Sequence, residues 1–428
     1  MSDKCDVLIS GAGPVGLTFA CLLKSQQPSL SVYIVDPQLD TSIAKNFSAD
    51  QRTIAMSLAT QEVYEGLGCW KALVNTIGKI ERIFISDAGH AGKAVLDKAD
   101  NNGRDLGYVV DQFILKQTLL KRAKQLDVKV LACAVTGAQS HPTGVWVETG
   151  DHQKVDAALL VVAEGANSPT RERLGITVKT TDYRQHALVT RVQHEYAHKQ
   201  EAYERFTAGG PIALLPLRHK RESALVLCSN LNTKPETASR SETNTFTSLD
   251  TMPEQHFLRV LHENLGYPHG AFTGCSERLV FPLTLVQANE QVRRSVVLIG
   301  NAYRSLHPVA GQGYNLSIRQ CVELTAALCS QGNYYRFHNE PIGSIARLEA
   351  FVESIDSDQR QTVTFSHGLH QVFANDFLPL ALARTLGLSS FAGSGALKAP
   401  LFSQLMGRSR PRRALSIFRR AANKRSQY

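Results

Sequence analysis

Apolar runs separated by glycine turns predict a sheet in which strands alternate with helices. Near the N-terminus a strand is expected at 7–10, a helix over 17–24 and a second strand over 31–35, which together make one strand–helix–strand unit. The continuous apolar runs at 156–163 and 295–299 are typical of strands that are buried on both faces, as in a parallel sheet.

A different pattern occupies residues 185–285. Short β-rich runs predict an inserted antiparallel sheet, and they lie at 187–192, 212–217, 224–228 and 278–285. Residues 230–255 are rich in Ser, Thr and Asn and are expected to form a mobile loop. Helical spacing of apolar residues is found at 111–126 and from about 313 to 330, and it continues from 345 to the end of the chain.

The net charge is concentrated at the C-terminus. The 428 residues carry 47 Lys and Arg against 38 Asp and Glu, a formal charge of +9. Residues 398–428 hold nine basic residues and no acidic one, so the first 397 residues are electrically balanced. A balanced body argues against nucleic-acid binding, which would need a basic stripe across the main face. The length and the apolar content of 43% indicate a globular protein with ample core.

The eight cysteines show no metal-ligand spacing, and no cluster of metal-binding residue types stands out. We expect reduced, mostly buried thiols, as in a cytoplasmic protein, and no bound metal. Asp6 and several glycines interrupt the apolar N-terminus, and no window reaches the roughly 18 apolar residues of a membrane-spanning helix. A soluble protein is therefore expected.

The first glycine turn carries the clearest chemical signal. Gly11, Gly13 and Gly16 are spaced G-x-G-x-x-G between the first strand and its helix, and Asp36 ends the next strand. Gly11 permits the tight turn, Gly13 lets a pyrophosphate approach the backbone, and Gly16 lets helix and strand pack closely. A carboxylate at Asp36 suits the hydroxyls of an unphosphorylated ribose, so a dinucleotide such as FAD or NAD is expected.

Two further glycine turns follow buried strands, and open α/β sheets bind their ligands at this edge. One is Glu164-Gly165, and the other is Gly300-Asn301. The second leads through 307–315 into a helix N-terminus, whose positive dipole end would stabilise negative charge on a reduced flavin ring. The joint occurrence of the three turns favours FAD.

Together these residues resemble the class A flavoprotein aromatic hydroxylases, which have the fold of p-hydroxybenzoate hydroxylase. Further motifs are similar to those of the ubiquinone-biosynthesis hydroxylases, above all the 2-polyprenyl-6-methoxyphenol hydroxylase branch. They are D-Q-R-T-I-A at 50–55, L-G-C-W at 67–70, S-D-A-G-H-A-G at 86–92, Y-E-R-F-T at 203–207, and G-N-A followed by H-P-V-A-G-Q-G-Y-N within 300–315. The resemblance runs from about residue 5 to about 407, and S-D-A-G-H-A-G is its best branch discriminator. The chain departs from the family in having Glu164 and Asn301 where Asp is usual.

The resemblance implies an FAD-dependent monooxygenase. NAD(P)H reduces the flavin, O2 adds to form a flavin hydroperoxide, and one oxygen atom passes to the ring of a polyprenyl phenol in ubiquinone biosynthesis. Three alternatives remain open: a sister hydroxylase acting at another ring position, a reductase or oxidase of the same fold, and a non-catalytic flavin-binding scaffold in a biosynthetic complex. Other ubiquinone-biosynthesis proteins are candidate partners.

The resemblance also implies roles for individual residues. The expected cofactor-binding residues are Gly11, Gly13, Gly16, Asp36, Arg52, Gln112, Glu164, Gly165, Gly300, Asn301, Gly311, Gln312, Gly313, Tyr314 and Asn315. His307 and Pro308 are the expected catalytic positions, where His307 either orders the flavin loop or takes part in proton transfer. The inserted sheet is expected to supply an apolar pocket, open towards a membrane, from Phe206, Leu214, Leu215, Phe281 and Leu283.

The expected fold class is α/β: an FAD-binding Rossmann-like domain with an inserted antiparallel β-sheet substrate domain and C-terminal helices. The expected boundaries are 1–75, 106–178 and 286–345 for the FAD-binding domain, 76–105 and 179–285 for the substrate domain, 346–407 for a helical region and 408–428 for a basic tail.

The basic tail has the pattern of an amphipathic helix. Over 412–425, six basic residues accompany apolar residues at helical spacing, namely Ala414, Leu415, Phe418, Ala421 and Ala422. Such a helix would lie on an anionic membrane surface, each basic residue contributing about 1 kcal/mol. A cytoplasmic protein that is peripherally associated with the inner face of the membrane is expected. The alternatives are a disordered, solubilising end and RNA binding.

Overall fold

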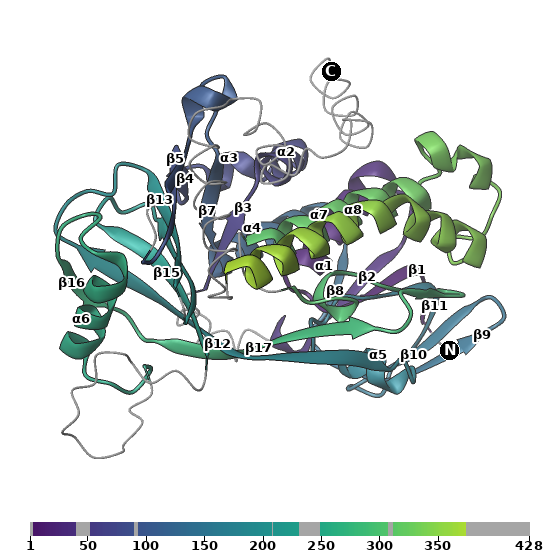
Figure 1. The fold of residues 1–428 in the computed structure, drawn as a ribbon. Helices are drawn as coiled ribbons and strands as arrows, with labels where there is room; N and C mark the ends of the chain where they lie inside the picture. Colours follow the sequence, from purple (N-terminus) through teal and green to yellow (C-terminus); the bar gives the residue numbers. More distant parts are fainter. Residues whose placement is uncertain are drawn as a thin grey trace.

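The computed structural model describes residues 3–39, 52–89, 93–207, 209–230, 249–306 and 311–373. Within them, three sheets and their helices form two lobes (Figure 1). The long strands β12 (Val178–His194) and β17 (Leu279–Ala288) run from one lobe to the other.

The first sheet is mainly parallel, with the strand order β18-β19-β11-β1-β2-β8. Its strands are β1 (Asp3–Ser10), β2 (Val32–Val35), β8 (Lys129–Leu131), β11 (Lys154–Val162), β18 (Val292–Arg293) and β19 (Val296–Leu298), with the hairpin β9 (Val135–His141) and β10 (Gly144–Thr149) joined to β11. Because β1, β2, β8, β11 and β19 run parallel, their carboxyl ends share one edge. The α/β fold class predicted from the apolar runs is confirmed, since strands covered on both faces bury every position.

Helices cover one face of this sheet, and the β9–β10 hairpin packs on the other (Figure 1). The longer helices are α1 (Pro14–Gln26), α4 (Gln112–Gln125), α7 (Gln312–Leu328) and α8 (Ile345–Phe373). The shorter helical segments, of which α5 packs on β9 and η3 follows β6 of the second sheet, are α2 (Leu58–Gly66), α3 (Trp70–Leu73), α5 (Pro169–Arg173), and the 3-10 turns η1 (Pro37–Leu39), η3 (Lys98–Asn101), η4 (Gly300–Ala302) and η6 (Gly332–Phe337). Along β1, Val7 and Ile9 pack against the helices whereas Leu8 packs on the hairpin side, because successive side chains of a strand point to opposite faces.

The second sheet is mainly antiparallel, with the order β16-β12-β15-β14-β13-β5-β6 and with β17 also paired to β12. Its other strands are β5 (Arg82–Asp87), β6 (Lys93–Asp97), β13 (Glu201–Thr207), β14 (Gly210–Pro216), β15 (Glu222–Asn230) and β16 (Phe272–Cys275). This is the inserted antiparallel sheet that the β-rich runs predicted. One pairing differs: β5, from a distant part of the chain, lies parallel to β13.

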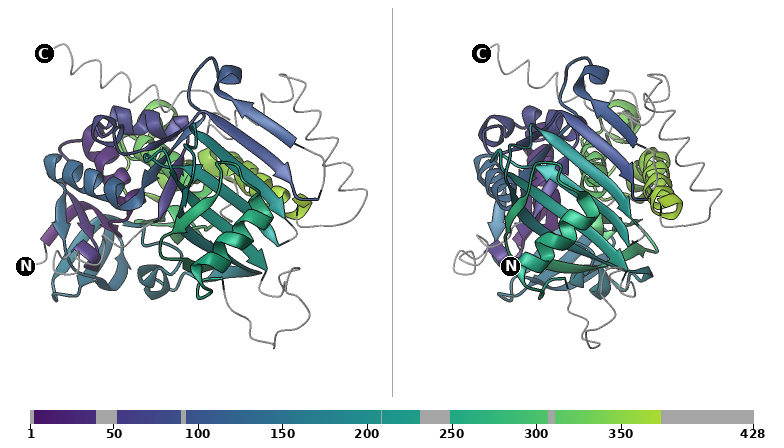
Figure 2. Two further views of the ribbon diagram at one scale, coloured as in Figure 1. Left: turned by 90° about the vertical axis from the view of Figure 1, so that its left-hand side faces the viewer. Right: turned by 60° about the vertical axis from the view of Figure 1, so that its left-hand side comes forward.

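Helix α6 (Glu254–Leu265) lies across one face of the second sheet (Figure 2). Phe257, Leu261 and Leu265 are spaced four residues apart and are buried against the sheet. This helix was not predicted from the sequence, although apolar residues at four-residue spacing on an otherwise mostly polar segment are typical of an amphipathic helix. The helix begins inside the segment expected to be a mobile loop, most of which (231–248) lies outside the described residues.

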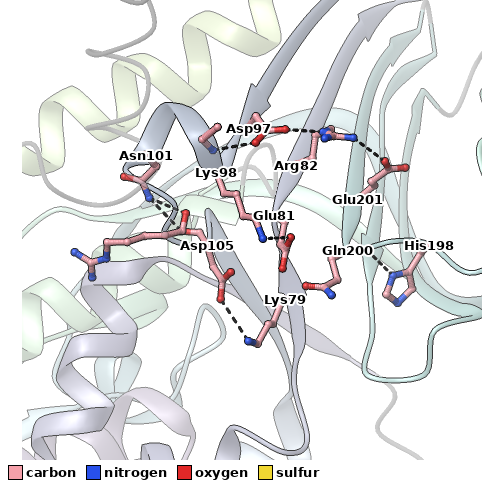
Figure 3. Close-up of polar contacts among 12 residues, drawn as sticks. Lys79, Glu81, Arg82, Asp97, Lys98, Asn101, Asp105, His198, Gln200 and Glu201 are labelled. Carbon is pink, nitrogen blue, oxygen red and sulfur yellow. Dashed lines mark hydrogen bonds and ion pairs between the residues drawn. The ribbon is translucent and has the colours of Figure 1, made fainter.

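A small third sheet joins the two lobes. It consists of β3 (Thr53–Met56), β7 (Gly107–Asp111) and β4 (Gly78–Ile80), which pair antiparallel. Only Glu81 separates β4 from β5 of the second sheet. The Glu81 N–H donates to the carbonyl of Gln200 (2.9 Å), its carbonyl accepts from the Lys98 N–H (2.8 Å), and its carboxylate pairs with Lys98 (Figure 3). The chain therefore passes from the third sheet to the second through Glu81, whose backbone and side chain are both held by these bonds.

Ion pairs line this crossing. Arg82 lies between Asp97, 2.7 Å from its Nε, and Glu201, 3.2 Å from its Nη1 (Figure 3). These side chains are partly exposed, so each pair contributes at most about 1 kcal/mol. The pairs thus hold β5 in register between β6 and β13 and add little stability.

Three buried histidines meet at the end of β12. His194, His198 and His269 are 2%, 3% and 4% exposed, and the rings of His194 and His269 are 4.9 Å apart. The Nδ1 of His198 accepts the N–H of Gln200 (3.0 Å), and its Nε2 lies 2.9 Å from the carbonyl of Leu217. Burial lowers the pKa of all three, that of His269 to about 4 with a further contribution from the other two rings and Lys199. The cluster is therefore uncharged in the folded protein at neutral pH.

This cluster predicts a loss of stability in mild acid. Because the folded-state pKa of His269 lies below the unfolded value of about 6.5, the unfolded chain binds more protons between those values. The free energy of unfolding should therefore fall as pH is lowered from 6.5 towards 4. His269→Phe should reduce that slope, whereas His256→Gln, on the exposed face of α6, should not. Urea unfolding at several pH values measures the slope, and an unchanged slope in His269→Phe would contradict the assignment.

All eight cysteines are free thiols, and six of them are buried, as predicted. Burial raises the pKa of the Cys69 thiol to about 11. In the part of the chain that the structure describes, no helix has the length and apolar character needed to cross a membrane.

Candidate functional site

Three glycine turns meet at the carboxyl ends of β1, β11 and β19. A Cβ at Gly11, after β1, would lie 2.6 Å from the carbonyl oxygen of Ala163, after β11. A Cβ at Gly300, after β19, would lie 3.3 Å from the side chain of Val15 in α1. Segments from three distant parts of the sequence therefore pack on one another at one edge of the first sheet.

Within the first turn, the glycines serve two different purposes. Gly11 has a φ of +108°, and a Cβ at Gly16 would lie 2.0 Å from the carbonyl oxygen of Gly11, so both are needed for the turn itself. A Cβ at Gly13, in contrast, would meet no atom of the described residues within 4 Å. Gly13 is also the N-cap of α1 and supplies no side-chain cap to its first N–H groups. Open space before an uncapped helix N-terminus is what a phosphate group requires.

Asp36 is held beside this turn. Its Oδ2 accepts the N–H of Ala12 (2.7 Å), and its Oδ1 accepts the N–H of Gln38 (2.8 Å). A carboxylate offers about four lone-pair sites. These two bonds orient the Asp36 carboxylate and leave it capacity for hydroxyl donors such as those of a ribose.

The two residues of the second turn, Glu164 and Gly165, have different surroundings. Gly165 has a φ of +90° and open space around the position of a Cβ. The Glu164 carboxylate is bonded within the protein, where it accepts hydrogen bonds from Ser10, Ser168 and Thr170. Its contact with a cofactor therefore stays a prediction from the family motif.

The third turn pairs a constrained glycine with an exposed amide. Gly300 has a φ of +60°, and its N–H donates to Oε1 of the buried Gln320 (2.9 Å). The Asn301 side chain is exposed at the sheet edge. An amide both donates and accepts, so Asn301 has the hydrogen-bonding capacity for a ribitol hydroxyl.

Helix α7 begins at this edge without a side-chain cap. Its N-cap, Gly311, has a φ of +59°, and a Cβ there would lie 2.8 Å from the Cβ of Ala55 in β3. Gln312 is buried at the first helical position, and Gly313 leaves room beside Leu306. The uncapped N–H groups and the dipole suit a group that develops negative charge.

Asn315 fixes the start of α7 to β3 and α2. Its Oδ1 accepts the N–H of Ser57 (2.9 Å) and the hydroxyl of Thr60 (2.8 Å). Its Nδ2 donates to the carbonyls of Ala55 (3.0 Å) and Gly311 (2.9 Å). The side chain is 3% exposed and all its hydrogen-bonding groups are used, so Asn315 anchors the helix start from within.

Tyr314 is likewise directed into the protein. Its hydroxyl is hydrogen-bonded to that of Tyr64 in α2, which lies 2.9 Å from the Thr18 hydroxyl in α1. Burial raises the pKa of both tyrosines well above the ordinary value. The hydroxyl of Tyr314 thus joins three helices, and a ring contact with the cofactor remains a prediction.

The structure brings Arg52 and Gln112 together at the start of α4. The Gln112 N–H donates to the carbonyl of Arg52 (3.0 Å), and the neighbouring Asp111 caps α4 by accepting from the N–H groups of Phe113 and Ile114. Asp111 also forms an ion pair with Arg191 of β12. This pair joins the second sheet to the helix that follows β7.

The five predicted pocket residues do not share one surface. Leu215, Phe206, Phe281 and Leu283 lie on the face of the second sheet opposite α6. Leu214 points the other way and is fully buried beneath α6, with Ile212 and Leu225. Leu214 therefore cannot line one surface together with the other four, because adjacent strand residues alternate between faces.

Several predicted positions lie outside the described residues. They are His307 and Pro308, residues 50 and 51 of the first similar motif, residues 90–92 of the S-D-A-G-H-A-G run, and the basic tail over 408–428. Among the residues that are described, no group of three or more His, Cys, Asp or Glu side chains is arranged to hold a metal ion.

The described residues fit FAD. Open space at Gly13, spare acceptor capacity on Asp36, the exposed Asn301 amide and two uncapped helix N-termini lie around one sheet edge. Such an arrangement matches the pyrophosphate, ribose and polyol parts of a dinucleotide.

Sequence reasoning missed several supporting residues, among them Arg171 and Gln320, which are each 2% exposed. Ser168 followed by Pro169 is a helix-start signal and could have revealed α5. No sequence signal marks Arg171 as a buried residue, because an arginine in a short polar helix is ordinarily exposed.

Comparisons with known proteins show the family to which the chain belongs. A family model described as FAD binding domain matches residues 4–333. The chain is 32% identical over 409 residues to the ubiquinone hydroxylase UbiL of Rhodospirillum rubrum, covering 95% of this chain and 90% of that protein. It is 26% identical over 409 residues to the 3-demethoxyubiquinol 3-hydroxylase of Escherichia coli, covering 95% of this chain and 99% of that protein.

Among solved structures, PqsL of Pseudomonas aeruginosa, a probable FAD-dependent monooxygenase, superimposes with a TM-score of 0.72 at 18% identity, covering 91% of this chain and all of that one. At this identity the likeness shows the fold alone. The family match and the identity to UbiL go further and confirm the predicted cofactor and enzyme class. The chain is an FAD-dependent monooxygenase that belongs to the FAD-binding-domain family and, within it, to the ubiquinone-biosynthesis hydroxylases.

Proposed function

We propose that this chain hydroxylates the aromatic ring of 2-polyprenyl-6-methoxyphenol in ubiquinone biosynthesis, with NAD(P)H as reductant and O2 as the source of oxygen. The meeting of three glycine turns at one sheet edge carries the FAD-dependent part of the proposal, because open α/β sheets bind dinucleotides at such an edge. The names of the relatives in Rhodospirillum rubrum and Escherichia coli support a ubiquinone precursor as substrate.

When bound, FAD supplies the redox chemistry that activates O2. The chain's own residues bind and orient it: the N–H groups behind Gly13 hold the pyrophosphate, and Asp36 accepts from the ribose. The α7 N-terminus, fixed by Asn315, stabilises negative charge on the ring. Pro308 and His307 belong to the segment that leads into this helix and are proposed to order it.

An apolar surface for the polyprenyl chain is proposed on the face of the second sheet that carries Leu215, Phe281 and Leu283. Phe281 is 37% exposed there, so part of its ring is open to an apolar ligand. Since this face is opposite α6, the substrate ring would approach from the side of the third sheet, where Arg52 and Gln112 lie.

A second candidate is hydroxylation at another ring position, as the name of the Escherichia coli relative suggests. Deletion of the gene and mass spectrometry of accumulated quinone precursors separate the two. Accumulation of 2-polyprenyl-6-methoxyphenol supports the proposal, whereas accumulation of a demethoxyubiquinol favours the second candidate. No accumulated precursor at all would contradict both.

The basic tail is proposed to hold the enzyme at the membrane that contains its substrate. Deletion of 409–428 should lower the fraction of protein that sediments with vesicles containing anionic lipid, because each basic residue contributes about 1 kcal/mol at such a surface. FAD content should not change, since no residue of the predicted site is removed. Equal sedimentation of both forms would contradict the proposed role.

A further inference from the structure

We propose that Arg191 is a substrate-binding residue, whose guanidinium donates hydrogen bonds to the phenol oxygen and to the neighbouring methoxy oxygen of the ring. The inference rests on the proposed function and deepens it by naming a residue that orients the ring. Arg191 belongs to β12, which runs from one lobe to the other. Its ion pair with Asp111 places the guanidinium where the second sheet meets the start of α4.

Arg191 lies on the face of the second sheet opposite α6. Leu188 and Val192 of β12 are buried beneath α6, and successive side chains of a strand alternate between faces, so Arg191 points to the other face. In the sheet it is paired with Ala224 of β15, which is paired in turn with Leu215 of β14. Arg191 therefore stands in one row with Leu215, on the face proposed to take the polyprenyl chain.

The guanidinium has donors that the protein does not use. The Arg191 side chain is 23% exposed, so a ligand can reach it. Within the described part of the chain, its one hydrogen bond runs from Nη2 to Oδ2 of Asp111, and its Nε is buried without a partner. A guanidinium carries five N–H donors in a planar fork. A half-buried cation with this many unused donors needs a further acceptor, which a bound ligand can supply.

Asp111 holds the guanidinium in place. Its Oδ1 accepts the N–H groups of Phe113 (2.9 Å) and Ile114 (3.2 Å) at the start of α4, while its Oδ2 pairs with Arg191. The carboxylate is thus fixed to a helix, and the guanidinium is fixed to the carboxylate. Gln112, the next residue, is expected to bind the cofactor. Asp111 therefore places Arg191 between the apolar face and the expected cofactor side.

The chemistry of the proposed ring matches this group. A 2-methoxyphenol carries two oxygen atoms on neighbouring ring carbons, and a guanidinium presents parallel N–H donors that can bind both. The positive charge also favours the ionised form of the phenol, which accepts the stronger hydrogen bond. Small-molecule sites typically combine an apolar lining with a few placed polar groups. The apolar face thus takes the prenyl chain, and Arg191 fixes the orientation of the ring.

The test measures the affinity of the FAD-loaded protein for two probes by isothermal titration calorimetry, without reductant. One probe is 2-methoxy-6-prenylphenol with a single isoprene unit, and the other is its methyl ether, which cannot ionise. Arg191→Met should raise the dissociation constant of the phenol roughly tenfold and that of the ether less than about twofold. Arg184→Met, at an exposed position of the same strand, is the matched control and should change neither.

A purely structural role for Arg191 would give a different pattern. If the ion pair only held the two lobes together, Arg191→Met would weaken the binding of both probes equally, and this result would overturn the proposal. An unchanged affinity for the phenol would overturn it as well. Arg191→Lys keeps the charge but replaces the fork by a single ammonium, so it should weaken phenol binding less, by about threefold.

Two checks keep the experiment interpretable. Thermal melting and the FAD content of each variant show whether it is folded. If Arg191→Met does not fold, Arg191→Gln takes its place, because its amide can still donate to Asp111 while the charge is lost. The same selective loss of phenol affinity is expected from it, and equal loss of both probes again overturns the role of Arg191.

Failure of the proposed function gives a separate result. If the unaltered FAD-loaded protein binds neither probe, the proposed substrate class is wrong and the inference falls with it. If the unaltered protein binds both probes and Arg191→Met loses them equally, the role of Arg191 alone is overturned.

Discussion

Replacing Gly13 by valine should abolish FAD binding and leave the apo-protein folded. Within the part of the chain that the structure describes, a Cβ at this position meets no atom within 4 Å, and the backbone φ of −69° is one that any residue adopts. The added methyl groups would instead occupy the space in front of the α1 N-terminus that a pyrophosphate must enter. The FAD dissociation constant should rise roughly 100-fold or more, while stability should change by no more than about 1 kcal/mol.

Absorbance of the purified protein at flavin wavelengths and thermal melting of the apo-form measure these two effects. Gly16→Ala is the informative contrast, because its Cβ would lie 2.0 Å from the carbonyl oxygen of Gly11. That variant should lose both FAD and stability. Normal FAD content in Gly13→Val would show that the pyrophosphate does not bind at this turn.

Replacing Asn315 by aspartate should be strongly destabilising although the two side chains have the same shape. The Asn315 amide donates to the carbonyls of Ala55 and Gly311, so a carboxylate oxygen there would face two acceptors. The site is 3% exposed, and an uncompensated buried charge costs about 3 kcal/mol or more. Chemical unfolding of the wild-type protein and of Asn315→Asp gives the difference in free energy of unfolding.

The same substitution at an exposed position provides the control. Asn301→Asp introduces the family's usual residue at an exposed site, and it should change stability by less than about 0.5 kcal/mol. A destabilisation by Asn315→Asp no larger than this would contradict the anchoring role of Asn315. Because Asn315 fixes the α7 N-terminus, the Asn315 variant should also weaken FAD binding more than the control does.

Features that depend on neighbours in sequence were predictable. The central strands of the first sheet were recognisable because a parallel strand covered on both faces is continuously apolar, as at 156–163. The G-x-G-x-x-G turn was recognisable because each glycine meets a local steric requirement of a strand–turn–helix unit. The α/β fold, the FAD cofactor and the monooxygenase class follow from these local signals together with the family resemblance, and all three are confirmed.

Features that depend on contacts between distant segments could not be read from the chain. Periodicity shows that Leu214 and Leu215 lie on opposite faces of a strand, but only the position of α6 decides which face it covers. Likewise, the presence of a glutamate in a family motif does not show in which direction its side chain points.

The tertiary structure decided the orientation of Glu164. Ser10, Ser168 and Thr170 surround the carboxylate, and their hydrogen bonds direct the Glu164 side chain towards the protein interior. By itself, the sequence determined the central strands and the glycine turns, because these are set by local conformation and short-range pattern, and together with the family resemblance it determined the cofactor class. Which side chains hold the turns in place was decided only by packing, because their hydrogen-bond partners come from distant parts of the chain.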